Sequence, residues 1–213
     1  MLSVVIPTLN AVATLATTLA SLAAADEVVV ADGGSSDGTQ ALATTRGARL
    51  LQAPRGRGAQ LAAGAAAASG EWLLLLHADT RLASGWREAR LDPDRAGYFR
   101  FTLDSDDPRA RRLEWLVAWR CRVLALPYGD QGLLIHRDLL AAVGGIRELP
   151  LMEDVDLVRR LGRRRLVALD AAAVTSAARW RRHGWYRRSA RNLACLSLYF
   201  AGVPPRLLVR LYG

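Results

Sequence analysis

Short apolar runs alternate with helix-like stretches over the first eighty residues. Ser3–Pro7 and Glu27–Ala31 are brief valine-rich runs typical of buried strands, and Ala13–Ala24 between them spaces its leucines for one helical face. The alternation continues with predicted elements at Thr39–Arg46 (helix), Ala48–Gln52 (strand), Gly58–Ser69 (helix) and Trp72–Leu76 (strand). Repeated strand–helix units predict parallel strands with right-handed crossovers and helices on both faces of the sheet.

The pattern is less regular after residue 80. The predicted strands are Tyr98–Leu103, Leu133–His136 and Leu166–Leu169, and the predicted helices are Pro108–Leu126, Arg137–Val143 and Glu153–Leu161. From Arg181 onward the chain is basic and then apolar, with a helical pattern that breaks at Pro204 and Pro205. We therefore expect one α/β domain over residues 1–213, with a mostly parallel central sheet and a C-terminal helical tail.

Composition narrows the class of protein. The net charge is +9, and all 29 basic residues are arginines, which favours anionic partners that a guanidinium can grip in a bidentate way. Cys121 and Cys195 lie far apart, which argues against a disulfide scaffold and suits a reducing compartment, so we expect a cytoplasmic protein. The sequence predicts no signal peptide and no membrane-spanning helix.

Polar segments follow the first two predicted strands at their carboxyl ends, where open parallel sheets bind ligands. In the first, Pro7, Thr8 and Asn10 are candidates to contact a nucleotide, although Asn10 could equally cap the following helix. The second is Asp32–Thr39. Its glycines allow close approach of a ligand, and a turn with Ser36 or Asp37 as helix cap is the competing interpretation.

Two further segments open a helix and end a strand. Arg57 and Gly58 begin a predicted helix whose free N–H groups could bind phosphate, although arginine–glycine turns are also common on surfaces. His77 and Asp79 directly follow an apolar strand, and residues two apart in extended chain point the same way. Such a pair suits Mn²⁺ or Mg²⁺, whereas the alternative is a strand-end turn with a structural aspartate.

Acidic residues in the second half are candidates for proton transfer. Glu153, Asp154 and Asp156 open one predicted helix, where the helix dipole accounts for one or two of them and a general base for another. We assign the base to Asp154, with neighbouring carboxylates expected to raise its proton affinity. Asp130, in the Gly129–Gly132 turn, is the competing candidate.

The segment Arg179–Arg188 interleaves arginines with aromatic residues. This pattern fits a helix packed on the core with a solvated arginine face, a helix at an anionic membrane surface, or a binder of single-stranded nucleic acid. We favour the first two, because a nucleotide-diphosphate site already accounts for part of the charge.

The motifs together resemble the family-2 glycosyltransferases with a GT-A, Rossmann-like fold. The matching segments are Ser3–Asn10, Asp32–Thr39, Ala78–Asp79 and Glu153–Asp154. The chain is most similar to a small bacterial subgroup, through Leu76–Thr80, Tyr128–Gly132, Pro150–Asp154 and Thr175–Trp180. It departs from the common family pattern where His77 replaces an aspartate and where Ala11, Ala62 and Ala178 stand at usually polar positions.

The resemblance implies inverting sugar transfer from a nucleotide-diphosphate donor, UDP-linked in many members, with a divalent metal. The residues implied to bind the donor are Pro7, Thr8, Asn10, Asp32, Gly34, Ser35, Arg57, Gly58, Ala78 and Asp79. Asp32 would read the nucleobase, Arg57 would help to hold the nucleotide or phosphate, Asp79 would bind the metal, and Asp154 would be the general base. His77 is a further candidate metal ligand, and Glu153 would orient the acceptor or shape the start of its helix.

On this reading residues 1–80 bind the donor, residues 81–178 hold the acceptor and catalytic groups, and residues 179–213 form the tail. The acceptor is left open among small molecules, lipid-linked molecules and glycans, and the tail could make peripheral membrane contact. The rival functions are a nucleotidyltransferase and a nucleotide-sugar-binding or membrane-surface module without transfer. A nucleotidyltransferase would need a basic, glycine-rich loop after the first strand, where this chain has Thr8–Ala11.

Overall fold

The computed structural model describes residues 1–212, and its centre is an eight-stranded sheet with the order β3-β2-β1-β4-β7-β6-β8-β5. The strands are β1 (Leu2–Thr8), β2 (Glu27–Asp32), β3 (Arg49–Gln52), β4 (Trp72–Leu75), β5 (Thr80–Leu82), β6 (Ala96–Leu103), β7 (Leu133–His136) and β8 (Leu166–Thr175). The first four strands pair in parallel, as the strand–helix alternation predicts. β7 runs antiparallel to β4 and β6, while β6 pairs in parallel with β8.

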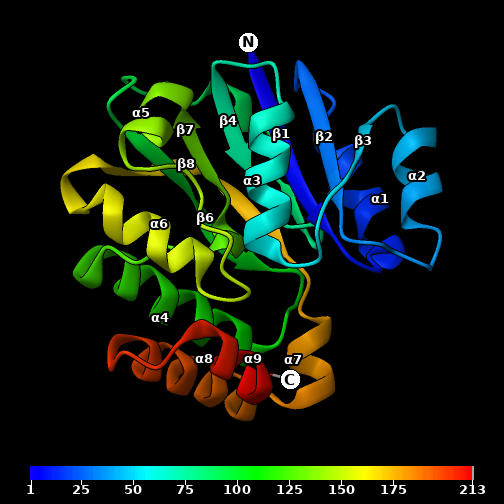
Figure 1. Cartoon of the computed structure of the whole chain (residues 1–213). Coiled ribbons are helices and arrows are strands. Elements are labelled where there is room, and N and C mark those ends of the chain that lie inside the picture. Colours follow the sequence, from blue (N-terminus) through cyan, green and yellow to red (C-terminus); the bar gives the residue numbers. More distant parts are fainter. Residues whose placement is uncertain (213) are drawn as a thin grey trace.

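Helices cover both faces of this sheet (Figure 1). They are α1 (Val12–Ala20), α2 (Thr39–Thr45), α3 (Arg57–Ala67), α4 (Pro108–Leu124), α5 (Arg137–Ala142), α6 (Glu153–Leu161), α7 (Ala178–His183), α8 (Trp185–Phe200) and α9 (Pro205–Tyr212). Because side chains alternate along a strand, Val4 and Ile6 join the core cluster of α1 and α2, whereas Val5 joins the cluster of α3 and α6. The expected α/β fold is confirmed.

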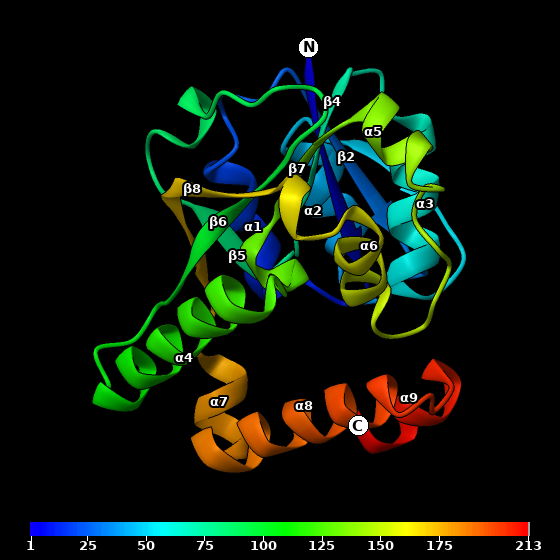
Figure 2. The ribbon, with the colours of Figure 1, turned by 90° about the vertical axis from the view of Figure 1, so that its left-hand side faces the viewer.

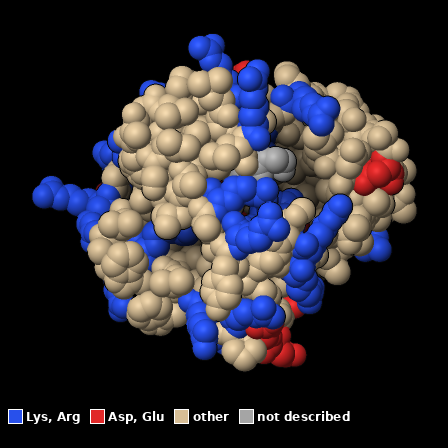
Figure 3. Space-filling view, turned by 90° about the horizontal axis from the view of Figure 1, so that it is seen from below, with Lys and Arg blue, Asp and Glu red and all other residues tan. Residues whose placement is uncertain are grey.

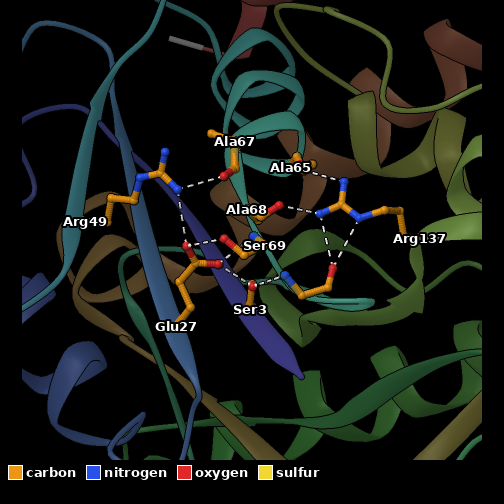
Figure 4. A network of polar contacts seen from close by, with 9 residues as sticks. Ser3, Glu27, Arg49, Ala65, Ala67, Ala68, Ser69 and Arg137 are labelled. Carbon is orange, nitrogen blue, oxygen red and sulfur yellow. Dashed lines mark hydrogen bonds and ion pairs between the residues drawn. The ribbon is translucent and has the colours of Figure 1, made fainter.

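The end of α3 far from the carboxyl ends of the strands is fixed by charged side chains (Figure 4). Arg137 donates to the backbone oxygens of Ala65, Ala68 and Gly70, and so satisfies carbonyls that the helix end leaves without partners. Glu27 accepts from Ser3 Oγ at 2.5 Å and from the Ser69 backbone N–H at 2.7 Å. These bonds tie α3 to β1 and β2, which sets where its opposite end lies.

The helices α4, α7, α8 and α9 lie together at one end of the molecule, below the sheet in both Figure 1 and Figure 2. The tail packs against the rest of the chain, since Cys195, Leu196 and Leu208 belong to the same core cluster as β1 and α3. Within residues 1–212, no helix combines the length and the apolar character that crossing a bilayer requires.

Two parts of the sheet differ from the expected elements. Thr80–Leu82 forms β5, and the strand expected at Leu166–Leu169 extends to Thr175 with a register shift at Phe99 and Arg100 of its partner β6. Both segments lack a clean apolar alternation, because β5 has only three residues and β8 contains four alanines.

Candidate active site

A cleft of about 530 Å³ opens at the carboxyl ends of β1 and β4. Its wall includes Pro7, Thr8 and Asn10 after β1, Arg55, Gly56 and Arg57 at the start of α3, and His77, Ala78 and Asp79 after β4. Arg179 of the α7 segment and Val209 of α9 complete it. The structure therefore gathers the first loop, the arginine–glycine turn and the His-Ala-Asp segment at one edge of the sheet, as expected for an open α/β sheet.

The loops after β1 and β2 are joined by side-chain hydrogen bonds. Asn10 Oδ1 accepts from the Ser36 N–H at 2.9 Å, while the Asn10 N–H donates to Ser35 Oγ at 2.8 Å. Asp37 accepts from the Val12 N–H at 3.1 Å and so serves the start of α1 from the neighbouring loop. Asn10 does not cap the helix that follows it, because the cap position belongs to Ala11.

Asp32 lies behind the cleft wall and is fully buried. Its carboxylate accepts from Thr8 Oγ1 at 2.8 Å, from Ser35 Oγ at 2.5 Å and from the Gly34 N–H at 3.0 Å. Burial alone would raise the pKa of Asp32, but hydrogen bonds from Ser35, Thr8 and Gln40 hold that pKa below its ordinary value. In this arrangement Asp32, Gly34 and Ser35 fix the conformation of the loop. Recognition of the nucleobase by Asp32 stays a prediction.

The start of α3 faces the cleft, and no side-chain hydrogen bond caps it. Gly58 instead packs on protein backbone, since a Cβ there would lie 2.5 Å from the Arg147 oxygen and 2.6 Å from the Leu149 nitrogen. The first turn of α3 is thus held tightly against the segment that leads into α6.

Arg57 joins α3 to the start of α6. Its Nε lies 2.9 Å from Oε1 of Glu153, a carboxylate that is only 1% exposed. Burial raises the pKa of Glu153 to about 7, with Asp154 adding to the shift and Arg57 opposing it. Glu153 therefore shapes the helix start and positions Arg57.

A second, smaller pocket of about 80 Å³ lies beyond the cleft. Its walls are Arg57, His77, Asp79, Tyr128, Asp130, Leu151, Met152, Asp154, Val155, Thr175, Arg179, Trp180, Arg188 and Asn192. Arg57, His77, Asp79 and Arg179 line both spaces, so the cleft and this inner pocket meet at these four side chains. Asp79 pairs with Arg179 there at 3.3 Å.

Asp154 and Asp130 both reach the inner pocket. Asp154 Oδ2 accepts from the Gly129 N–H at 2.7 Å, which fixes the carboxylate against the Gly129–Gln131 turn. Asp130 Oδ1 is buried and has no hydrogen-bond partner within residues 1–212. Burial raises the pKa of Asp130 to about 6, with Asp154 and Asp79 adding to the shift and Arg120 opposing it.

His77 is a neutral imidazole at this boundary. Burial, with the positive charge of Arg57 adding to the shift and Asp79 opposing it, lowers the pKa of His77 to about 4. Its buried Nε2 has no hydrogen-bond partner among the described residues and lies against Gly129, where an added Cβ would come within 2.4 Å. This nitrogen therefore faces Gly129, which is not among the residues that line the inner pocket.

Sequence reasoning missed several residues of the inner pocket. Arg188 and Asn192 come from α8, which was expected to be a tail, and Arg188 lies over the Trp180 ring at 5.1 Å. Thr175 and Arg179 fall inside the segment Thr175–Trp180, so that motif was the signal for them. Nothing in the sequence pattern indicates Arg188 or Asn192, because their place depends on how α8 folds back.

Comparison with known proteins agrees with this architecture. Residues 3–107 match the model of the family described as Glycosyl transferase family 2. This match covers just under half of the chain, so glycosyl transferase family 2 is the family that residues 3–107 are similar to, and the solved structures show that the chain has a GT-A fold.

Solved structures share the fold at low sequence identity. Glucosyl-3-phosphoglycerate synthase from Mycobacterium tuberculosis, solved with Mn²⁺, UDP and glucosyl-3-phosphoglycerate, is 22% identical with a TM-score of 0.55, over 82% of this chain and 71% of that one. TarS from S. aureus is 17% identical with a TM-score of 0.62, over 99% of this chain and 69% of that one.

A curated relative covers a shorter stretch. A TPR repeat-containing protein of Synechococcus elongatus is 36% identical over 93 residues, which is 42% of this chain and 23% of that protein. The chain thus matches less than a quarter of the length of this curated relative.

Proposed function

We propose that the protein is an inverting glycosyltransferase that moves a sugar from a nucleotide diphosphate, with UDP as the nucleotide, to an acceptor hydroxyl. The observation that carries the proposal is the meeting of the cleft and the inner pocket at Arg57, Asp79 and Arg179. A diphosphate at that boundary would lie beside two guanidinium groups and the start of α3. Its sugar would then face the inner pocket, where the two aspartates lie.

Asp79 is our proposed protein ligand for a divalent cation, Mn²⁺ or Mg²⁺. Within residues 1–212 no three His, Cys, Asp or Glu side chains gather into a metal site, so the ion would need diphosphate oxygens as further ligands. The Asp79 carboxylate at the pocket boundary fits such a shared site. The ion would offset the charge that develops on the leaving diphosphate. Neutral His77 is a second candidate ligand.

Asp154 is our proposed general base. In an inverting transfer the acceptor oxygen bonds to the anomeric carbon as the bond from that carbon to the diphosphate oxygen breaks, and the hydroxyl proton passes to the base. Asp154 is fixed by the Gly129 N–H and faces the inner pocket, which supports this role. Asp130 lines the same pocket and remains the competing assignment.

The acceptor site is proposed to be the inner pocket. Its wall combines apolar Leu151 and Met152 with aromatic Tyr128 and Trp180, together with the Arg188 guanidinium. These side chains suit an acceptor with a polar hydroxyl end, whether a small molecule, a lipid-linked molecule or a glycan.

Buried Cys121 and Cys195, both free, are in keeping with a cytoplasmic setting.

The test is release of free UDP from a panel of UDP-sugars with Mn²⁺ present. We expect turnover that excess chelator removes and that Asp79→Asn nearly abolishes, because the carboxylate is the proposed metal ligand. Asp94→Asn, at an exposed position that lines neither the cleft nor the inner pocket, is the matched control and should keep full turnover. Binding without release of UDP would instead favour a nucleotide-sugar-binding module, and full release in chelator would refute the metal assignment.

A further inference from the structure

The helical end of the molecule exposes large apolar side chains. On α4, Trp115 is 63% exposed and Trp119 is 43% exposed, and on α8 the values are 69% for Tyr186 and 63% for Leu193. Figures 1 and 2 both place α4 and α8 at the same end. Large exposed apolar patches mark interaction sites in proteins that are otherwise well packed.

The exposed residues of α4 form a second apolar face on that helix. Val117 and Cys121 point inward and belong to the cluster that includes Phe101 of β6. At 100° per residue, Trp115 and Trp119 project from the opposite side of the helix. Leu116 and Val123, both exposed, flank them. One face of α4 therefore packs against the core, whereas the opposite face has no packing partner within residues 1–212.

The charge around these residues is strongly positive. Residues 171–213 contain eight arginines and no aspartate or glutamate. Figure 3 shows arginines spread over this end, with acidic residues only toward the rim of the view. Arg112, Arg122 and Arg187 are exposed, and none of the three is paired with a carboxylate in the described part of the chain. The partner of this surface should therefore be anionic.

A bilayer fits this combination better than a second copy of the chain. A two-fold dimer through these helices would set the same arginines against one another. An anionic bilayer instead offers phosphate groups to arginine and an interfacial layer in which tryptophan and tyrosine are favoured. Single-stranded nucleic acid would supply the charge, but it would leave aliphatic residues such as Leu193 and Val123 without a matching partner.

We propose that the outward sides of α4 and α8 form a docking face for an anionic lipid bilayer. Trp115, Trp119, Tyr186 and Leu193 enter the interfacial layer, and Arg112 and Arg122 contact the headgroups. The protein lies on the bilayer without spanning it. This inference does not depend on sugar transfer, because it concerns a surface outside the cleft and the inner pocket.

The test is co-sedimentation of the whole chain with vesicles of phosphatidylglycerol and phosphatidylcholine at low salt. We expect binding to these vesicles, little binding to pure phosphatidylcholine, and release as salt rises. Bromine on the acyl chains quenches only tryptophan rings that reach acyl-chain depth. We therefore expect lipids with brominated acyl chains to quench the tryptophan fluorescence of the bound protein.

Two variants separate the apolar and charged contributions. Trp115→Ser with Trp119→Ser should remove most of the quenching, and Arg112→Glu with Arg122→Glu should weaken binding by about tenfold or more. The control is Arg46→Glu with Arg90→Glu, two exposed arginines elsewhere on the molecule. It carries the same change in charge and should bind almost as the unmodified chain does.

Several results would overturn the proposal. They are absence of vesicle binding at low salt, equal loss in the control variant, and vesicle binding without quenching. A dimer in solution that the Trp115 and Trp119 substitutions dissociate would assign the face to a second copy. Tighter binding to a single-stranded oligonucleotide, lost in the same variants, would assign it to nucleic acid. Circular dichroism of each variant checks that a loss of binding is not a loss of fold.

Discussion

At the scale of single residues, the environment of each carboxylate separates its role more clearly than its position in the sequence does. Asp32 accepts from five donors, which lie at the end of β1, in its own loop and in α2. Glu153 is buried against Arg57, whereas Asp154 and Asp130 reach the inner pocket. The sequence reasoning expected all four at the site, yet only the last two face space that an acceptor could enter.

The Asp154→Asn variant is expected to keep UDP-sugar binding and to lower transfer by about a hundredfold or more, because an amide cannot take the acceptor proton. Asp130→Asn should act mainly on acceptor affinity. Rates at saturating donor with varied acceptor, once an acceptor has been found, separate kcat from KM. Near-normal transfer by Asp154→Asn together with an inactive Asp130→Asn would exchange the two roles.

The Glu153 carboxyl should make stability depend on pH. Its pKa is raised from 4.5 to about 7 by burial, so the folded state holds a proton that the unfolded state has lost. Its contribution is therefore full below about pH 4.5 and is lost as pH rises from there through about 7. His77 acts in the opposite direction over much of this range, because burial lowers its pKa from 6.5 to about 4, so the effect of Glu153 is measured as a difference between variant and unmodified chain.

We therefore expect the melting temperature of Glu153→Gln, measured relative to the unmodified chain, to rise between about pH 4.5 and 7, because the variant lacks the carboxyl whose contribution is lost there. Thermal unfolding across this range measures it. Glu71→Gln, at an exposed glutamate, is the control and should leave the slope as it was. A slope that Glu153→Gln leaves unchanged would contradict the assignment.

At the scale of elements, the sequence predicted the strands that carry strong apolar runs. It missed the features of the sheet that depend on which strand pairs with which. Trp72–Leu75 is a strand because four apolar residues in sequence suit a buried position, and the pattern alone shows this. Thr80–Leu82 pairs with a strand more than ninety residues later, which no local pattern records. The direction of β7 likewise depends on its neighbours and not on its own residues.

The close contact between α3 and the segment before α6 can be tested by substitution of Gly58. Gly58→Ala would place a Cβ 2.5 Å from the Arg147 oxygen, and we expect a loss of about 1–3 kcal/mol in the free energy of unfolding. Gly33→Ala is the comparison with a milder approach, because its Cβ would lie 3.0 Å from Nε2 of Gln60 and not 2.5 Å from a backbone atom. Urea unfolding measures both, and an equal or larger loss at Gly33 would contradict this account.

At the scale of the whole molecule, the C-terminal segment is part of the domain. It supplies Cys195, Leu196 and Leu208 to the main core cluster, and it supplies Arg188 and Asn192 to the inner pocket. The sequence predicted its helical and basic character, but its packing depends on distant contacts that the local pattern does not contain.

Removing residues 179–213 should therefore destabilise the entire domain, because it would expose the apolar residues that the segment covers. We expect a lower melting temperature and binding of a hydrophobic dye by the shortened chain. Removing residues 211–213 alone is the control and should have little effect on melting. A shortened chain that melts as the full chain does would show the segment to be a separate appendage.

The joined loops after β1 and β2 have a consequence for amide hydrogen exchange. Loop amides ordinarily exchange quickly because water reaches them, but the N–H groups of Asn10, Ser35 and Ser36 donate to side chains of the same or the facing loop. These amides should exchange slowly although they lie outside any helix or strand. Protection there before any ligand is added would mean that this wall of the cleft is already in its binding shape, so a nucleotide would not have to order it.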